Sequence, residues 1–303
     1  MKAKIDFMGK RTVAAIFSAI LLVVSIGSFV FQGFNLGLDF TGGTQVEVGY
    51  KNAADLKSIR AILKANEFGD ATVQLFGKPT EVLVRIPPRE GQGKAKVGEV
   101  VLNILRGADE NVILKRVEFV GPQVGEELRD QSGSAMIFAL GLMLVYVTLR
   151  FQFKFALGAV TALFHDVLIV MGFFSVFQIT FDLTVLAAVL AVIGYSLNDT
   201  IVVADRIREN FRKLREGSGI EIINISLNQT LGRTIITSLT TLLVLTALAV
   251  LGGELIHGFA VALLVGVVIG TYSSIYVASN VLLAMDISRE DFLEKEEDIP
   301  EVP

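Results

Sequence analysis

The sequence has no cysteine, no tryptophan and only two histidines among its 303 residues. Without cysteine there is no disulfide, no cysteine-ligated zinc site and no thiol nucleophile. Two histidines also argue against a histidine-rich metal site, so no metal is predicted. Without tryptophan, an aromatic belt at a membrane surface would consist of Tyr and Phe. No glycine-rich stretch ends in Lys-Ser/Thr, which argues against an ATPase or another nucleotide-dependent enzyme. We expect no cofactor and no nucleic-acid partner.

Charged residues are scarce as well, at 19% of the chain, whereas 52% of residues are hydrophobic and the mean hydropathy is +0.60. This balance is typical of a multi-span membrane protein with one polar domain. Because ~20 helical residues cover the hydrocarbon core of a bilayer, we predict a polytopic α-helical membrane protein with six transmembrane helices. They are expected at residues 12–34, 133–149, 155–177, 183–204, 234–252 and 256–284. The first has a basic flank but no small-residue cleavage site, which favours an uncleaved helix over a signal peptide.

Residues 35–132 are different, because they are charged and show alternating apolar patterns. The expected order is β-α-β-β-α-β, the ferredoxin-like split arrangement of an α+β domain. This stretch has no histidine and no carboxylates at metal-ligand spacing, so we interpret it as a binding or lever module rather than a catalytic one. The predicted strands are 44–50, 71–76, 81–86 and 111–120, with a turn at 77–80, and the predicted helices are 53–68 (capped by Asn52) and 91–105.

The distribution of basic residues predicts the orientation. Outside 35–132, Lys and Arg occur at the N-terminus, in 150–154, in 205–233 and in the C-terminal tail, whereas the turns at 178–182 and 253–257 have none. The positive-inside rule therefore predicts that both termini are cytoplasmic and that the 35–132 domain lies outside. The predicted units are 1–34 (N-terminus and first helix), 35–132, 133–284 (helices two to six, with a cytoplasmic loop 205–233) and an acidic cytoplasmic tail, 285–303. Within the loop, Ile220–Leu231 is either an amphipathic helix on the inner membrane surface or a solvated connector.

Asn198 and Asp199 lie inside the fourth apolar run, about one turn from its charged end at Asp205 and Arg206. A carboxylate at this depth costs roughly 2.5–3.5 kcal/mol on insertion scales, so Asp199 is expected to face a bundle interior, a water-filled cavity or a partner. Burial disfavours the charged form of an aspartate, which makes such a residue a natural proton-binding group. Asp205, by contrast, is expected to reach toward the headgroups.

Two further polar features lie in the apolar runs. His165 and Asp166, near the middle of the third run, either relay protons or form a buried pair that locks two helices together. Arg233, which opens the fifth run, forms a stripe with Thr237 and Thr241. We interpret it either as an anchor on the inner side or as a cation facing a carboxylate across the bundle, and most of the stripe's hydroxyls as interhelical hydrogen bonds.

Glycines mark three other places. Asp39-Phe40-Thr41-Gly42-Gly43 follows the first run, and its glycines suit a tight turn with positive φ. Gly121-Pro122 punctuates the chain before the second run. In the sixth run, Gly266 and Gly270 form a GxxxG pattern, which predicts close helix packing.

Together these motifs resemble the SecD/SecF family of bacterial protein-export membrane proteins over almost the whole chain. The most specific is the run from Gly194 to Glu209, which contains Asn198-Asp199-Thr200. The others are Gly37-x-Asp39-Phe40-Thr41-Gly42-Gly43, Gly121-Pro122-x-Val124-Gly125 and His165-Asp166.

The resemblance implies half of a twelve-helix core of the resistance–nodulation–division (RND) type, completed by SecD as a partner. It implies association with the SecYEG translocon and YajC in the cytoplasmic (inner) membrane, and use of the proton-motive force to promote export of unfolded preproteins. In the family, the residues that correspond to Asp199 and Arg233 are linked to proton passage, so protons are the expected coupling ion.

Three other functions remain open at this point. An RND-type exporter of small molecules or lipids would use the same intramembrane acid, although the outer region is short for a substrate pocket. A scaffold would use the buried polar groups only to specify packing. An intramembrane hydrolase is disfavoured, since no nucleophile–base pattern occurs.

Overall fold

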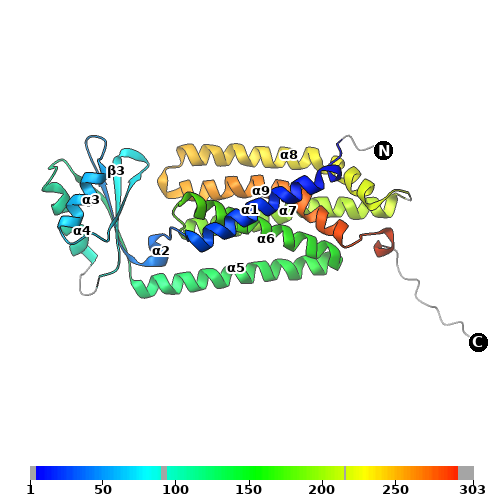
Figure 1. Ribbon diagram of the computed structural model, residues 1–303, viewed down its shortest axis with the longest axis horizontal. Coiled ribbons are helices and arrows are strands. Elements are labelled where there is room, and N and C mark those ends of the chain that lie inside the picture. The colour runs from blue at the N-terminus through cyan, green and yellow to red at the C-terminus, as the bar shows by residue number, and fades with distance from the viewer. Residues whose placement is uncertain (1–4, 90–93, 215, 293–303) are drawn as a thin grey trace, which may run out of the picture.

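The computed structural model describes residues 5–89, 94–214 and 216–292. It contains six helices long and apolar enough to cross a membrane, which confirms the predicted polytopic architecture. A short turn, η1 (Met8–Lys10), leads into the first. The six are α1 (Arg11–Phe31), α5 (Pro122–Arg150), α6 (Phe153–Phe177), α7 (Leu183–Lys213), α8 (Gly219–Leu251) and α9 (Glu254–Ala284). Figure 1 shows them as an elongated bundle, with a small sheet domain at one end and the start of α1 and the end of α9 at the other.

The sheet domain has the predicted ferredoxin-like order. Its strands are β1 (Gly43–Gly49), β2 (Thr72–Phe76), β3 (Lys78–Ile86) and β4 (Ile113–Val120), arranged β2-β3-β1-β4 with every neighbouring pair antiparallel. The helices α3 (Leu56–Ala65) and α4 (Lys94–Arg106) cover the face that points away from the bundle (Figure 1). Alternate residues of β1 and β3, such as Val46 and Val84, are fully buried against Leu63 and Leu105 of these helices. Period-two alternation therefore builds the core of this domain.

Some predicted boundaries within this domain are wrong. Helix α3 begins at Leu56, because the side chain of Asp55 rather than Asn52 caps it by accepting from the Lys57 amide. The hairpin between β2 and β3 is tighter than predicted, with only Gly77 (φ +73°) between the strands. The first residues of the predicted 91–105 helix lie outside the described residues, and the described helix begins at Lys94.

Three membrane helices are longer than their apolar runs. Helix α5 starts at Pro122 rather than at residue 133, with proline in the first turn, where its missing N–H is not needed. Helix α7 continues to Lys213. The 220–231 stretch is neither a separate surface helix nor a solvated connector, because it forms the first turns of the continuous helix α8. Its apolar side packs into the core, and Asn224 accepts hydrogen bonds from the amides of Phe7 and Met8.

Helices α6 and α7 form the centre of the bundle, since 56% of the spanning window of each is buried, against 17% for α1, α5 and α8. The GxxxG prediction is confirmed on α9. A Cβ on Gly266 would lie 2.1 Å from a methyl group of Val192, and one on Gly270 would lie 3.1 Å from Ser196 on α7. Glycine at both positions lets α7 and α9 approach closely, and this positions the polar residues that follow Gly270. From residue 293 onward, the predicted acidic tail lies outside the described residues.

Candidate functional site

Asp199 lies in the seam between three helices, and its side chain is held by hydroxyl groups. It is 8% exposed on α7. Thr234 of α8 donates to its Oδ1 at 2.7 Å, and Ser274 of α9 donates to its Oδ2 at 2.5 Å. Both carboxylate oxygens therefore act as acceptors, as expected of a buried carboxylate that must be hydrogen-bonded. Of the three surroundings expected for Asp199, the structure shows a bundle interior, formed by helices of this single chain.

The structure does not bring Arg233 and Asn198 into this seam. Both side chains are exposed, on the outer faces of α8 and α7. Among the described residues no ion pair joins Arg233 to Asp199. Arg233 instead lines a cavity of about 260 Å³ together with Arg150, Asp205 and Glu209. Its assignment as the counter-ion of Asp199 thus stays a prediction.

The polar stripe of α8 faces differently from what the spacing suggested. Thr237 is exposed, and its hydroxyl and that of Thr241 donate to carbonyls of their own helix, so neither makes the interhelical bond that was predicted. The hydroxyls that point into the bundle are those of Thr234 and Ser238, and Ser238 bonds Thr271 of α9 at 2.7 Å. The stripe that packs against the neighbouring helices is therefore that of Thr234 and Ser238, one residue further along α8.

His165 and Asp166 form a second polar cluster, which is fully enclosed. Asp166 is 0% exposed, and its Oδ1 lies 2.9 Å from Nδ1 of His165. Its Oδ2 accepts hydrogen bonds from Ser196 of α7 and Ser273 of α9. The other ring nitrogen of His165 lies 3.1 Å from the Ser18 hydroxyl of α1. This cluster joins four helices through a single carboxylate–imidazole pair.

The two clusters meet at consecutive residues of α9, because Ser273 bonds Asp166 and Ser274 bonds Asp199. The sequence analysis did not single out either serine, nor Ser18 or Ser196. The one available signal was the cluster of hydroxyl residues from Thr271 to Ser274, which directly follows Gly270 in the sixth apolar run.

At the start of α7, the Asp39–Gly43 motif joins the sheet domain to the bundle. It forms the short helix α2 (Leu38–Thr41), and Oδ2 of Asp39 accepts from the Leu183 amide in the first turn of α7. Phe40 is buried against Phe181. A Cβ on Gly43 (φ +114°) would lie 2.3 Å from the Ile86 carbonyl oxygen, so the predicted positive φ is present and no larger residue fits.

The start of α5 packs onto the same motif. A Cβ on Gly42 would lie 2.9 Å from Cα of Pro122, and one on Gly125 would lie 2.8 Å from the Gly42 amide nitrogen. Arg85 of β3 donates to the Leu36 carbonyl. Burial lowers the pKa of the Arg85 guanidinium, while the nearby Asp182 and Asp39 oppose that shift. Strand β1 and helices α5 and α7 thus meet at one junction, whose centre is Asp39–Gly43.

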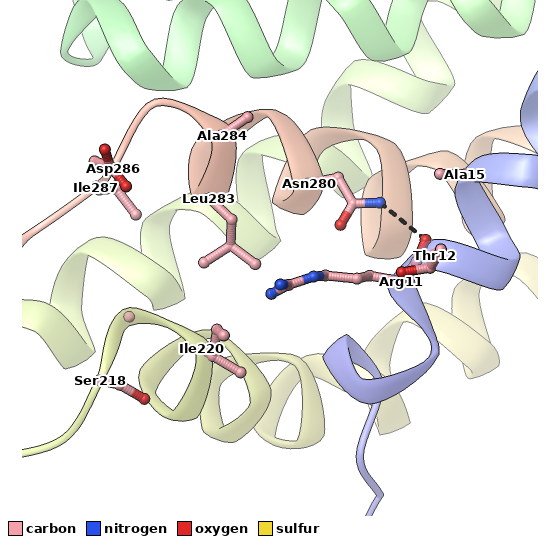
Figure 2. Close-up of a pocket in the computed structure, with 11 residues that line it drawn as sticks. Arg11, Thr12, Ala15, Ser218, Ile220, Asn280, Leu283, Ala284, Asp286 and Ile287 are labelled. Atoms are coloured by element: carbon pink, nitrogen blue, oxygen red, sulfur yellow. Dashed lines mark hydrogen bonds between the residues drawn. The ribbon is translucent and has the colours of Figure 1, made fainter.

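Another cavity lies away from both clusters, at the end of the bundle where α1 begins and α9 ends. It measures about 640 Å³. Figure 2 shows the side chain of Arg11, at the start of α1, extending between the start of α8 and the end of α9. None of its lining residues belongs to either carboxylate cluster. Among the described residues there is also no group of three or more His, Asp or Glu that could hold a metal ion.

Comparison with known proteins gives consistent matches. A family model described as "Protein export membrane protein SecD/SecF, C-terminal" matches residues 100–288, and one described as "SecD/SecF GG Motif" matches residues 27–54. The protein translocase subunit SecF of Pseudomonas aeruginosa is 54% identical over 289 residues, which cover 95% of this chain and 94% of that relative. The subunit SecF of Escherichia coli O157:H7 is 46% identical over 292 residues, covering 96% and 90%.

Solved structures agree with these relatives. A crystal structure of SecDF, a translocon-associated membrane protein from Thermus thermophilus, superposes with a TM-score of 0.83 at 38% identity and covers 93% of this chain. A structure of SecDF in a super-membrane-facing form gives a TM-score of 0.70 at 37% identity and covers 94% of this chain. The present chain spans 38% and 39% of those solved chains.

Proposed function

The chain belongs to the SecD/SecF family of protein-export membrane proteins, and we propose that it uses the proton-motive force to promote export of preproteins. The observation that carries this proposal is the setting of Asp199. A carboxylate buried in a membrane span, held by neutral hydroxyls from two other helices, is a group whose packing depends on its protonation state. We propose that the protein catalyses no enzymatic reaction of its own and that protons are its only coupling ion.

In the proposed mechanism, protonation removes the charge of Asp199 and with it the need for two donors. Ser274 already has an alternative acceptor, the Thr271 carbonyl at 3.0 Å on its own helix. Release of Ser274 and Thr234 would let α7 move against α8 and α9. Because Asp39 is bonded to the first turn of α7, such a movement reaches the sheet domain, which acts as the lever on emerging polypeptide.

The exposed residues near this site support a shared, multi-subunit arrangement. Asn198 and Arg233 lie on outer faces of the chain, where we propose that helices of SecD complete an RND-type core and a proton path. Arg233 directly precedes Thr234, and we propose that it approaches Asp199 in another conformation of the cycle. SecYEG and YajC are the further proposed partners in the inner membrane, with both termini cytoplasmic and the sheet domain outside.

Export into inverted membrane vesicles with an imposed proton gradient tests the proposal. Asp199→Asn keeps the size of the side chain but cannot exchange a proton, so the complex should assemble while the gradient-dependent part of export is lost. The matched control is Asp205→Asn, which neutralises an exposed carboxylate on the same helix and should export normally. Gradient-dependent export that survives in the assembled Asp199→Asn complex would contradict the proposal.

A further inference from the structure

The hydrogen bonds around His165 fix where protons must be. A hydroxyl group has one proton to donate. The Tyr272 hydroxyl donates to the Ala14 carbonyl oxygen at 2.6 Å, so the 2.9 Å contact between Tyr272 and Ser18 requires Ser18 to donate. With its proton committed to Tyr272, Ser18 can only accept from His165. The nitrogen Nε2 of His165 therefore carries a proton.

The same reasoning applies to Asp166. Its Oδ2 accepts two hydroxyl protons, from Ser196 and Ser273. Its Oδ1 lies 2.9 Å from Nδ1 of His165, and a hydrogen bond there needs a second proton between the two atoms. The pair therefore holds two protons, either as imidazolium and carboxylate or as neutral imidazole and carboxylic acid. In both forms its net charge is zero, one proton above a neutral histidine beside an ionised aspartate.

We propose that the His165–Asp166 pair is a second proton-binding site, loaded in this arrangement and coupled to Asp199 through Ser273 and Ser274. The inference rests on the proposed proton-driven function and adds a station to it. Asp199 accepts at both oxygens, which suits its ionised form. Two net negative charges buried on neighbouring helices would oppose each other, so a proton on one site favours the ionised form of the other.

When the pair releases a proton, the hydrogen bond between His165 on α6 and Ser18 on α1 changes direction. The remaining proton lies on Nδ1 and donates to Oδ1 of Asp166, while Nε2 becomes an acceptor. The Ser18 hydroxyl then turns from Tyr272 to Nε2. The Ser18–Tyr272 contact between α1 and α9 is lost. The bond from Tyr272 to the Ala14 carbonyl of α1 and the link between α1 and α6 both remain. Because α1 leads into the Asp39–Gly43 junction, this change reaches the sheet domain by a route separate from α7.

The released proton passes from Nε2 to water. A buried place for one water molecule lies in the α6–α7–α9 seam, about two helical turns from Asp166 and without contact to the pair. Thr200 lies one turn beyond Ser196 on the same face of α7. Its hydroxyl and that of Ser279 are buried and have no hydrogen-bond partner among the described residues, and both line a cavity of about 10 Å³. That volume is close to the minimum for one water, and two hydroxyls meet its need for polar partners.

The other titratable groups around the pair are few. Within the adjoining spans they are Asp199 and the phenol of Tyr195 on α7 and the phenols of Tyr272 and Tyr276 on α9, and α1 has none between Arg11 and its end. On α5 the nearest candidates are at its ends, with none between Asp130 and Tyr146. Asp199 is thus the group whose charge is expected to govern proton binding by the pair.

Nitrogen-15 NMR of the imidazoles tests the inference directly, in the full chain assembled with its partner. The chain has only two histidines, and His257, exposed at the α8–α9 turn, serves as the internal reference, assigned by His257→Gln. Wild-type His165 is expected to show a protonated Nε2. Tyr272→Phe frees the Ser18 proton to point at Nε2, so proton release should become about fivefold easier, the worth of one hydrogen bond. Tyr276→Phe, a neighbouring ring 5.4 Å away, should leave the signal unchanged.

The coupling to Asp199 is measured in the same spectra. Asp199→Asn removes the neighbouring negative charge, so the pair should release its proton more readily and the share of His165 with a protonated Nε2 should fall relative to wild type at the same pH. Asp205→Asn is the charge-matched control. An unprotonated Nε2 throughout the range in which the complex is folded, or equal spectra for the two tyrosine variants, would overturn the second site. No change of that share in Asp199→Asn would overturn its coupling. Normal gradient-driven export by Asp199→Asn would instead contradict the proposed function and leave the NMR result standing.

Discussion

Asp199 on α7 and Asp166 on α6 are both buried carboxylates, but the groups that hydrogen-bond them differ in number and kind. Asp199 is 8% exposed and has two hydroxyl donors, one on each oxygen. Asp166 is fully enclosed and has an imidazole and two hydroxyls. The first lies at the seam with the peripheral helix α8, whereas the second is tied to α1, α7 and α9 at once. Because Asp166 is fully enclosed, it is part of the bundle's core. Asp199 has fewer hydrogen-bond partners, which leaves it free to exchange them.

The largest expected difference between the two is in stability. Asp166→Ala removes the partner of His165 Nδ1 and of the Ser196 hydroxyl in the core, although Ser273 keeps its bond to the Gly270 carbonyl. Removing one member of a buried ion pair costs about 3–5 kcal/mol. Asp199→Ala leaves only two hydroxyls, at a cost of about 1–3 kcal/mol, and Ser274 can turn to its own helix. Thermal unfolding of the purified complex in detergent measures both, with Asp205→Ala as an exposed control. Equal losses of stability in the two variants, or a larger loss in Asp199→Ala, would contradict this difference between the two aspartates.

The sequence predicts the acidic members of both clusters but not their partners. Asp199, His165 and Asp166 are conspicuous because a charge is expensive in an apolar run. Serine and threonine carry no such penalty, so Ser18, Ser196 and Ser273 are indistinguishable from ordinary packing residues until the helices are placed. Rotation of a helix about its axis is equally hidden. The Arg233–Thr237–Thr241 stripe and the Thr234–Ser238 stripe have the same spacing, and only packing selects the second.

The fold shows the same division. Alternating apolar residues predict the strands of the sheet domain, and the order β-α-β-β-α-β predicts their arrangement. Helix ends are predicted less well, since hydropathy marks where a membrane run stops and not where the helix does. Helix α8 continues through its polar first turns because they pack on η1 and α7, and α5 begins at Pro122 because the Asp39–Gly43 motif fixes its start. Such tertiary causes leave no local signal.

A second prediction compares two threonines one turn apart on α8. Thr234→Val removes a donor to Asp199, and a hydrogen bond to a charged group is worth about 1.5–3 kcal/mol. Thr237→Val removes only a bond to carbonyls of its own helix on an exposed face, so it should be nearly neutral. Gradient-dependent export and thermal unfolding should both distinguish the variants. If Thr237→Val impaired export as much as Thr234→Val, the exposed stripe would carry the function and the seam would not.

The smallest expected difference is in the stability cost of replacing Ser273 or Ser274, the consecutive serines of α9. Ser273→Ala leaves Asp166 with Ser196 and His165, whereas Ser274→Ala leaves Asp199 with Thr234 alone, so the second should cost more, by about 1 kcal/mol. The decisive measurement is a double-mutant cycle of Ser274→Ala with Asp199→Asn, with Ser273→Ala and Asp199→Asn as the matched cycle. Contacting groups give non-additive costs, and independent ones add to within about 0.5 kcal/mol. Non-additivity in the first cycle alone would make the clusters independent neighbours. Non-additivity in both would mean that Ser273, which bonds Asp166 and not Asp199, also responds to the charge on Asp199, as two coupled proton sites require.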